Sequence, residues 1–175
     1  ISDSILVITS RNFSNFKIAP DASFISLQPA LTGAQVNGLL AKYSKKIGPD
    51  PASINAAMIG GIAANNASGM CCGISQNSYK TLKSMKLIFA DGAKLDTGCQ
   101  ESKDAFRKTH GDFLKELKNF SNDTKNNEEL RAKIERKFKI KNTCGYSLNA
   151  LIDFEDEFEI LEHLIIGSEG TLAFI

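Results

Sequence analysis

The sequence predicts an α+β fold in which a mainly antiparallel sheet has helices packed on it. Short apolar segments flank the turn signals Pro20-Asp21 and Asp91-Gly92, as strands flank the turns of β-hairpins. Longer segments place apolar residues at helical spacing between and after these hairpins. A chain of 175 residues that is 42% hydrophobic is also long enough to bury the core of one globular domain.

Charge and cysteine content exclude several function classes. The 21 basic and 20 acidic residues nearly cancel, so we expect no nucleic-acid partner. No apolar run approaches the ~20 residues of a transmembrane helix, and no signal peptide opens the chain. Cys71, Cys72, Cys99 and Cys144 contain no C-x-x-C pair, so we predict reduced thiols and no metal site. We expect a cytoplasmic protein, or one bound peripherally at the inner membrane in its full-length form.

The first third of the chain predicts a hairpin followed by a helix. Strands are expected on both sides of Pro20-Asp21, within residues 16–27. Thr32 is a suitable N-cap, and apolar residues recur at helical spacing from 36 to 43. The prolines and glycine of residues 48–51 end that helix.

The second half predicts one more hairpin and then three helices. Strands flank Asp91-Gly92, and Ser102 is expected to cap the helix that follows. Residues 119–129 are predicted to be an exposed connection because they are rich in Asn, Asp, Ser and Lys. Amphipathic helices are expected over 130–138 and within or after the acidic segment 153–162.

Residues 52–69 are almost all small, with few charges. Small side chains fill a core poorly, whereas a backbone that lies close to a ligand requires them. Amides of a Gly60-Gly61 turn, with a helix over 62–67, could donate to phosphate oxygens. A tight glycine turn beside a packed helix remains the alternative, because neither G-x-G-x-x-G nor the P-loop lysine is present. The turn at 167–172, taken alone, could begin any strand.

The polar residues outside this segment predict no catalytic triad. His110 shares a helical face with Phe106, which favours a half-buried core position, and His163 is expected to be structural or solvent-facing. Neither histidine has a nucleophile or carboxylate partner that the sequence reveals. The basic segment 131–141 is expected to be a solvated face, with electrostatic contact to a partner domain as the alternative.

Several motifs in order resemble the FAD-linked oxidases of the vanillyl-alcohol-oxidase type, with the PCMH-type FAD-binding fold. They are Pro49–Ser53, Ile59–Asn65, Ala67–Gly69, the K-N-x-x-G-Y stretch Lys141–Tyr146, and the G-S-E-G-T-L stretch within Ile166–Leu172. The hairpin turn that ends in Asp91-Gly92 is similar to one in that family. Each motif alone is weak, but their common order across most of the chain is specific.

The resemblance implies that FAD is the cofactor and that this chain holds the second FAD-binding subdomain. It assigns no catalytic residue and no metal ligand to the chain. The residues that it places along the cofactor are Pro51, Ser53, Gly60, Gly61, Ala64, Asn65, Ala67, Gly69, Gly73, Ser75, Glu169, Gly170 and Ile175. We therefore expect residues 1–175 to be a partial FAD-binding domain, with the N-terminal FAD subdomain and a C-terminal substrate domain outside the chain.

The same resemblance implies oxidation of a D-2-hydroxy acid of the D-lactate, glycolate or D-2-hydroxyglutarate type, with hydride transfer to flavin. The segment 125–141 is similar to large bacterial members fused to an iron–sulfur domain, so a cluster is expected in the full-length protein and not in this chain. That domain or another acceptor would take the electrons. The fragment itself is expected to be inactive, and its exposed apolar surface to self-associate.

Two alternatives to this interpretation remain open. The first is an FAD oxidoreductase of the same fold that acts on another alcohol, a sugar or a cell-wall precursor. The second is a non-catalytic interaction module that uses the basic face of residues 125–141.

Overall fold

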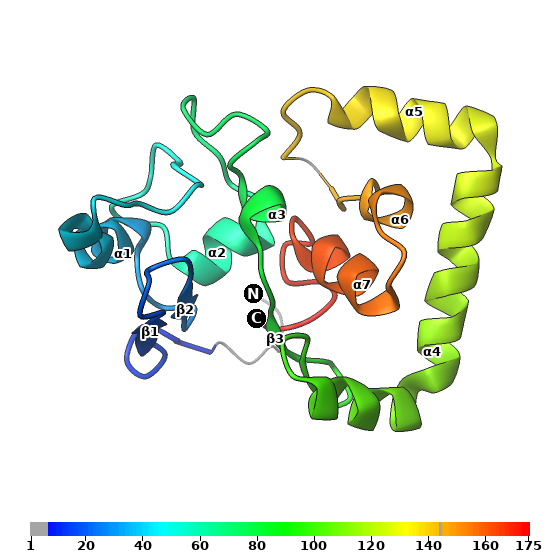
Figure 1. Cartoon of the computed structure of the whole chain (residues 1–175), viewed down its shortest axis with the longest axis horizontal. Coiled ribbons are helices and arrows are strands. Elements are labelled where there is room, and N and C mark those ends of the chain that lie inside the picture. Colours follow the sequence, from blue (N-terminus) through cyan, green and yellow to red (C-terminus); the bar gives the residue numbers. More distant parts are fainter. Residues whose placement is uncertain (1–6, 144) are drawn as a thin grey trace, which may run out of the picture.

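A computed structural model describes residues 7–143 and 145–175 and confirms the α+β class (Figure 1). Its strands form two separate antiparallel pairs rather than one sheet. Each strand is only three residues long, so each pairs mainly with its own hairpin partner. Helices therefore supply most of the regular structure around both pairs.

The first hairpin forms where the Pro20-Asp21 turn predicts it. Strand β1 (Phe16–Ile18) pairs with β2 (Ile25–Leu27) in antiparallel register. In the turn, the Asp21 carboxylate accepts hydrogen bonds from the amide and the hydroxyl of Ser23. This side-chain turn fixes the reversal of the chain locally.

Helix α1 (Gly33–Leu40) begins at the predicted cap, Thr32, and continues as the 3-10 helix η1 (Ala41–Tyr43). The Thr32 hydroxyl accepts from the Gln35 amide at 3.2 Å, while the Gln35 side chain accepts from the Thr32 amide at 2.8 Å. This reciprocal pair is a capping box. Leu31, Val36 and Leu40 then form a small core beneath the first hairpin.

The second hairpin joins β3 (Lys86–Ile88) to β4 (Lys94–Asp96) around Asp91-Gly92, as predicted. Gly92 adopts φ +84°, a conformation that a residue with a Cβ rarely takes. Ile88 also bridges Phe174, so the end of the described chain lies beside β3 (Figure 1).

Helix α4 (Gln100–Asn126) contradicts the exposed connection predicted over 119–129, and Asn127 then caps α5 (Glu128–Phe138). The polar side chains of this stretch are used in tertiary contacts: the Ser121 hydroxyl donates to the Leu151 carbonyl at 2.6 Å, and Lys125 Nζ donates to the Phe154 carbonyl at 2.7 Å. These contacts stabilise two further helical turns. Ser102 is also not the cap, because it lies inside the first turn and accepts from the Asp96 amide.

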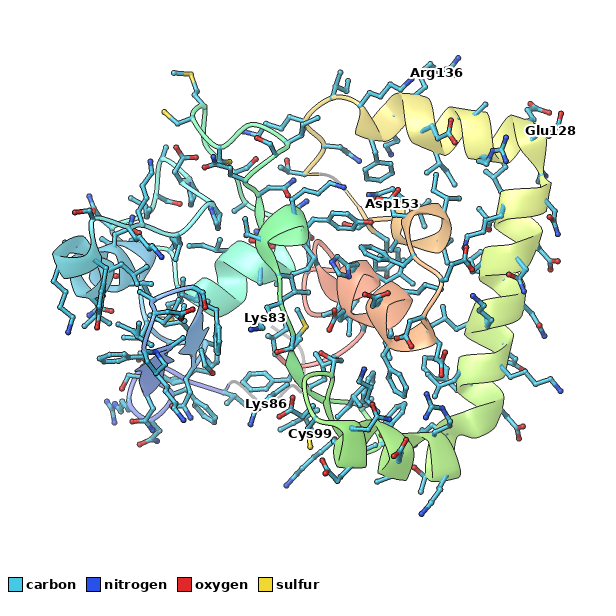
Figure 2. All side chains as sticks on the ribbon, in the orientation of Figure 1. Lys83, Lys86, Cys99, Glu128, Arg136 and Asp153 are labelled. Atoms are coloured by element: carbon cyan, nitrogen blue, oxygen red, sulfur yellow. The ribbon has the colours of Figure 1, made fainter. Side chains whose placement is uncertain are left out.

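The main core forms around α7 (Glu157–Ile165), which lies between α4 and the short helix α3 (Ser78–Thr81), while the short helix α6 (Ala150–Asp153) contacts both α4 and α7 (Figure 1). Its apolar face packs against the inward side chains of both β3 and β4 and against α4. In Figure 2, Asp153 lies on the side of α6 that faces α3, and it accepts from the Tyr79 hydroxyl at 2.8 Å. Arg136 on α5 points outward and is exposed to solvent (Figure 2).

Both histidines have structural partners. His163 is 6% exposed, and its ring stacks on Phe154 with 4.0 Å between centroids. His110 stacks on Phe106 and pairs with the Asp91 carboxylate, with 2.9 Å between Nε2 and Oδ2. The expectation that His110 has no carboxylate partner is therefore wrong, because the hairpin turn brings Asp91 to a helix that begins nine residues later.

Cysteine and membrane expectations can be checked only for the described part of the chain. There, Cys71, Cys72 and Cys99 are free thiols, whereas Cys144 lies outside the described residues. No helix within residues 7–143 and 145–175 combines the length and apolarity that crossing a bilayer requires. The same residues contain no cluster of three potential metal-ligating side chains.

Burial of Glu162 on α7 predicts a pH-dependent stability. Glu162 is 6% exposed, and its carboxyl group accepts a hydrogen bond from the Thr97 hydroxyl, which in turn accepts from the Met85 amide at 2.8 Å. Burial raises the pKa of Glu162 from 4.5 to about 7, so the folded state holds a proton that the unfolded state releases between these values. The resulting stability is complete below pH 4.5 and is lost as the pH rises through about 7.

We therefore expect Glu162→Gln to stabilise the protein above neutral pH by about 1–3 kcal/mol and to flatten its pH dependence. Denaturant unfolding at about pH 5 and about pH 8 measures the effect. Glu116→Gln, an exposed change on α4 away from this carboxyl group, is the control. Equal pH dependence in the wild type and in Glu162→Gln would contradict the assignment.

Candidate functional site

Helix α2 (Ile59–Ala64) ends where two predicted cofactor segments meet. The Gly167 amide donates to the Ala63 carbonyl at 3.1 Å, and the Glu169 amide donates to the Ala64 carbonyl at 2.8 Å. The last carbonyls of a helix lack partners within the helix, so these bonds satisfy them. The G-S-E-G turn is thereby fixed to the end of the small-residue segment, about 100 positions earlier in the chain.

The K-N-x-x-G-Y stretch lies against both of these segments. Lys141 Nζ donates to the Ser68 carbonyl at 2.6 Å, and the Tyr146 hydroxyl lies 2.9 Å from the Thr171 hydroxyl. Gly167 adopts φ +89°, and a Cβ built on it would lie 3.3 Å from the Gly145 carbonyl oxygen. Three motifs that are separate in sequence therefore form one surface.

Asp50 links the first motif to the same surface. Its Oδ1 accepts from the Gly69 amide at 3.0 Å and from the Cys72 amide at 3.1 Å. Hydrogen bonds from Cys72 and Gly69 hold the pKa of Asp50 below its ordinary value. The carboxylate is thus ionised, and it is hydrogen-bonded to the loop that follows α2.

The glycine pair corrects one sequence prediction. Gly60 and Gly61 lie within the first turn of α2 and do not form a turn before it, because the helix begins at Ile59. The Gly60 amide donates to the Pro29 carbonyl at 3.0 Å, and a Cβ on Gly60 would lie 2.7 Å from the Pro29 Cβ. Close packing against Pro29 thus explains why residue 60 is glycine. The hydrogen bond to the Pro29 carbonyl also means that the Gly60 amide is not free to bind a phosphate.

Gly61 differs from Gly60 because it is exposed and a Cβ on it would meet no atom within 4 Å. Gly73 and Gly170 also face open space, but their φ angles of +52° and +77° explain the glycines by backbone conformation. Glu169 adopts φ +54° although it has a Cβ, and such backbone strain concentrates at functional sites.

The remaining predicted residues lie in different surroundings. Ser53 is exposed in a loop whose Ala57 carbonyl accepts from the Gly33 amide at the start of α1, and Pro51 is buried in the same loop. Ile175 follows the bridge to β3 and packs on the main core. The other predicted residues follow α2 or end it: Ala64 and Ala67 are half-buried, whereas Asn65 and Ser75 are exposed.

Sequence reasoning missed the residues that hold this surface together. Asp50 and Lys141 lie inside motifs that it quoted, yet neither was predicted to act there. Asn66 adopts φ +45° and accepts from the Tyr79 amide at 3.4 Å, while the buried Ser168 hydroxyl has no hydrogen-bond partner among the described residues. A charged side chain within an otherwise small and uncharged motif was the available signal for Asp50.

Exposed apolar side chains lie on the same loops. Met70 is 98% exposed and Ile140 is 70% exposed, and Ile74, Tyr146 and Leu172 are also open to solvent. Exposed apolar groups beside strained polar turns are typical of a surface that a ligand or another domain covers.

Comparison with known proteins identifies the family. Residues 1–98 match the FAD binding domain family. The chain is also 26% identical, over 181 aligned positions, to a D-2-hydroxyglutarate dehydrogenase of Haemophilus influenzae; the match covers all of this chain but 18% of that protein. No solved structure matches the chain. Because the family match covers 98 of 175 residues, this chain belongs to the FAD-binding domain family.

Proposed function

We propose that this chain forms one part of the FAD site of an oxidoreductase that oxidises a D-2-hydroxy acid. The observation that best supports this proposal is the convergence of the motif segments, joined by the bond from the Glu169 amide to the Ala64 carbonyl. The name of the Haemophilus influenzae relative supports the choice of substrate class.

The surface has features that suit a long cofactor with an aromatic ring and polar groups. Gly61 leaves backbone open on an exposed helical turn, although glycine in a helix costs about 1 kcal/mol relative to alanine. A group that approaches this backbone closely would make glycine necessary there. Exposed Met70 and Tyr146 offer apolar contact.

Bound FAD would supply the capacity to accept a hydride, and the chain would position it. In this proposal Glu169 and Gly170 lie along the cofactor with Ala64, Asn65 and Ala67, because the hydrogen bonds at the end of α2 fix their loops together. Gly60 acts through packing against Pro29. The further proposed contacts are Pro51, Ser53, Gly61, Gly69, Gly73, Ser75 and Ile175.

The substrate and the electron acceptor would bind to other parts of a longer protein. The chain spans 18% of the length of the curated relative that it matches. We propose that residues 1–175 are the second FAD subdomain, that the hydroxy acid binds in a separate substrate domain, and that an iron–sulfur domain receives the electrons. The proposed compartment is the cytoplasm, which suits the free thiols of Cys71, Cys72 and Cys99.

Gly61→Ala should change FAD affinity and folding stability in opposite directions. The added methyl group has room within the chain and should raise helix stability by up to about 1 kcal/mol. The same methyl group should weaken FAD binding about tenfold or more, which corresponds to about 1.4 kcal/mol. FAD titration of the full-length protein, followed by the visible flavin spectrum, and thermal unfolding measure the two effects.

Gly38→Ala is the matched control, because Gly38 also lies in a helix where an added Cβ would meet no atom within 4 Å, but outside every motif. It should raise stability without weakening FAD binding. Failure of the full-length wild-type protein to bind FAD, or equal affinities for the full-length wild type and Gly61→Ala, would contradict the proposed site.

The substrate class can be tested with the full-length protein. D-2-hydroxyglutarate, D-lactate or glycolate should bleach the visible absorption of bound flavin in the absence of oxygen, because substrate oxidation reduces the cofactor. The L-enantiomers of the chiral acids are the controls. Bleaching by an unrelated alcohol or sugar, and by none of these acids, would favour another substrate class.

A further inference from the structure

Two side chains of opposite charge hold the backbone at Gly69. The Gly69 amide donates to Asp50 Oδ1 at 3.0 Å. On the other side of the peptide, Lys141 Nζ donates to the Ser68 carbonyl at 2.6 Å and lies 3.4 Å from the Gly69 carbonyl. An anion therefore binds the amide while a cation binds the carbonyls, which are the strong charge-assisted forms of these hydrogen bonds.

The close approach of Gly69 to Asp50 and a second amide hydrogen bond, from buried Cys72, reinforce this arrangement. A Cβ on Gly69 would lie 1.9 Å from the Asp50 carbonyl oxygen, so the two segments approach more closely than any other residue would allow. Cys72 is 1% exposed, and its amide donates to the same Asp50 oxygen at 3.1 Å. Residues 68–72, here called the Gly69 loop, thus fold around one carboxylate.

The two charged residues come from distant parts of the chain. Asp50 precedes α2, whereas Lys141 follows α5 and is 72 positions beyond Gly69. Helix α4 leads outward into α5, which runs in a different direction, and the segment after α5 returns toward the centre of the molecule (Figure 1). The chain segment that contains α4 and α5 therefore ends with the Lys141 ammonium group bound to the Gly69 loop on the proposed FAD surface.

The charges also explain how a carboxylate is tolerated beside the site of an anionic cofactor. A free carboxylate there would repel a diphosphate group. Asp50 instead accepts hydrogen bonds from two amides, and Lys141 places a positive charge on the other side of the same peptide. The pair holds the loop while adding no net charge to the surface.

We propose that Asp50 and Lys141 are positioning residues, which act without touching the cofactor and set the shape of the Gly69 loop on which FAD affinity depends. This inference rests on the proposed function. In this proposal Lys141, the first residue of the K-N-x-x-G-Y stretch, connects the segment after α5 to the Gly69 loop through hydrogen bonds.

Hydrogen–deuterium exchange of the FAD-free protein tests the hold on the loop directly. Asp50→Ala and Lys141→Met should each accelerate amide exchange in residues 68–72 about tenfold or more, because each removes a charge-assisted hydrogen bond. Asp50→Asn keeps an acceptor oxygen and should largely restore protection. Lys139→Met removes a neighbouring exposed lysine and should change nothing. Unchanged exchange within α7 shows that the variants are folded.

FAD titration of the same variants, made in the full-length protein, tests the consequence for the site. Affinity should fall in Asp50→Ala and Lys141→Met, recover in Asp50→Asn and remain unchanged in Lys139→Met, with a matching change in the visible flavin spectrum. Unaltered loop exchange in both disruptive variants overturns the hold on the loop, and faster exchange with unaltered FAD affinity overturns the positioning role. Failure of the wild type to bind FAD instead overturns the proposed function, whatever the exchange shows.

Discussion

Burial of helix α7 is the constraint on which the second half of this structure depends. Its apolar side chains contact the inward faces of β3 and β4, the inner side of α4 and the short helix α6. Burying this surface supplies the main driving force for ordering these elements. Because α7 leads directly into Gly167, the same packing fixes where the G-S-E-G turn emerges and allows its amides to reach the end of α2.

Backbone groups and charged side chains then join the small-residue segment to this core. Carbonyls at the end of α2 accept the amides of Gly167 and Glu169, and the loop after α2 is bound between Asp50 and Lys141. The loop after α2, which is rich in alanine, asparagine and glycine, buries little apolar surface of its own. Its shape consequently depends on polar contacts with residues outside it. Because its side chains are small, its backbone remains accessible.

The same tertiary contacts explain where sequence prediction failed. Residues 119–126 have the composition of a loop, but Ser121 and Lys125 donate to carbonyls near α6 and extend α4. Asp91 and His110 are separated in sequence by strand β4 and the first turns of α4, so their pairing could not be inferred from spacing. The strand pairs and the Thr32 cap were predictable because turn residues and a capping box act within a few positions of one another.

The sequence by itself determined the α+β class, both hairpins, most helices and the FAD-binding family, since each depends on local patterns or on motif order. The tertiary structure decided which motif residues meet, that Gly60 is required by packing, and that Asp50 and Lys141 hold the Gly69 loop. The physical reason is range: turn and capping signals act over a few residues, whereas these contacts join groups up to about 100 positions apart. Only the folded core brings such groups within hydrogen-bond distance.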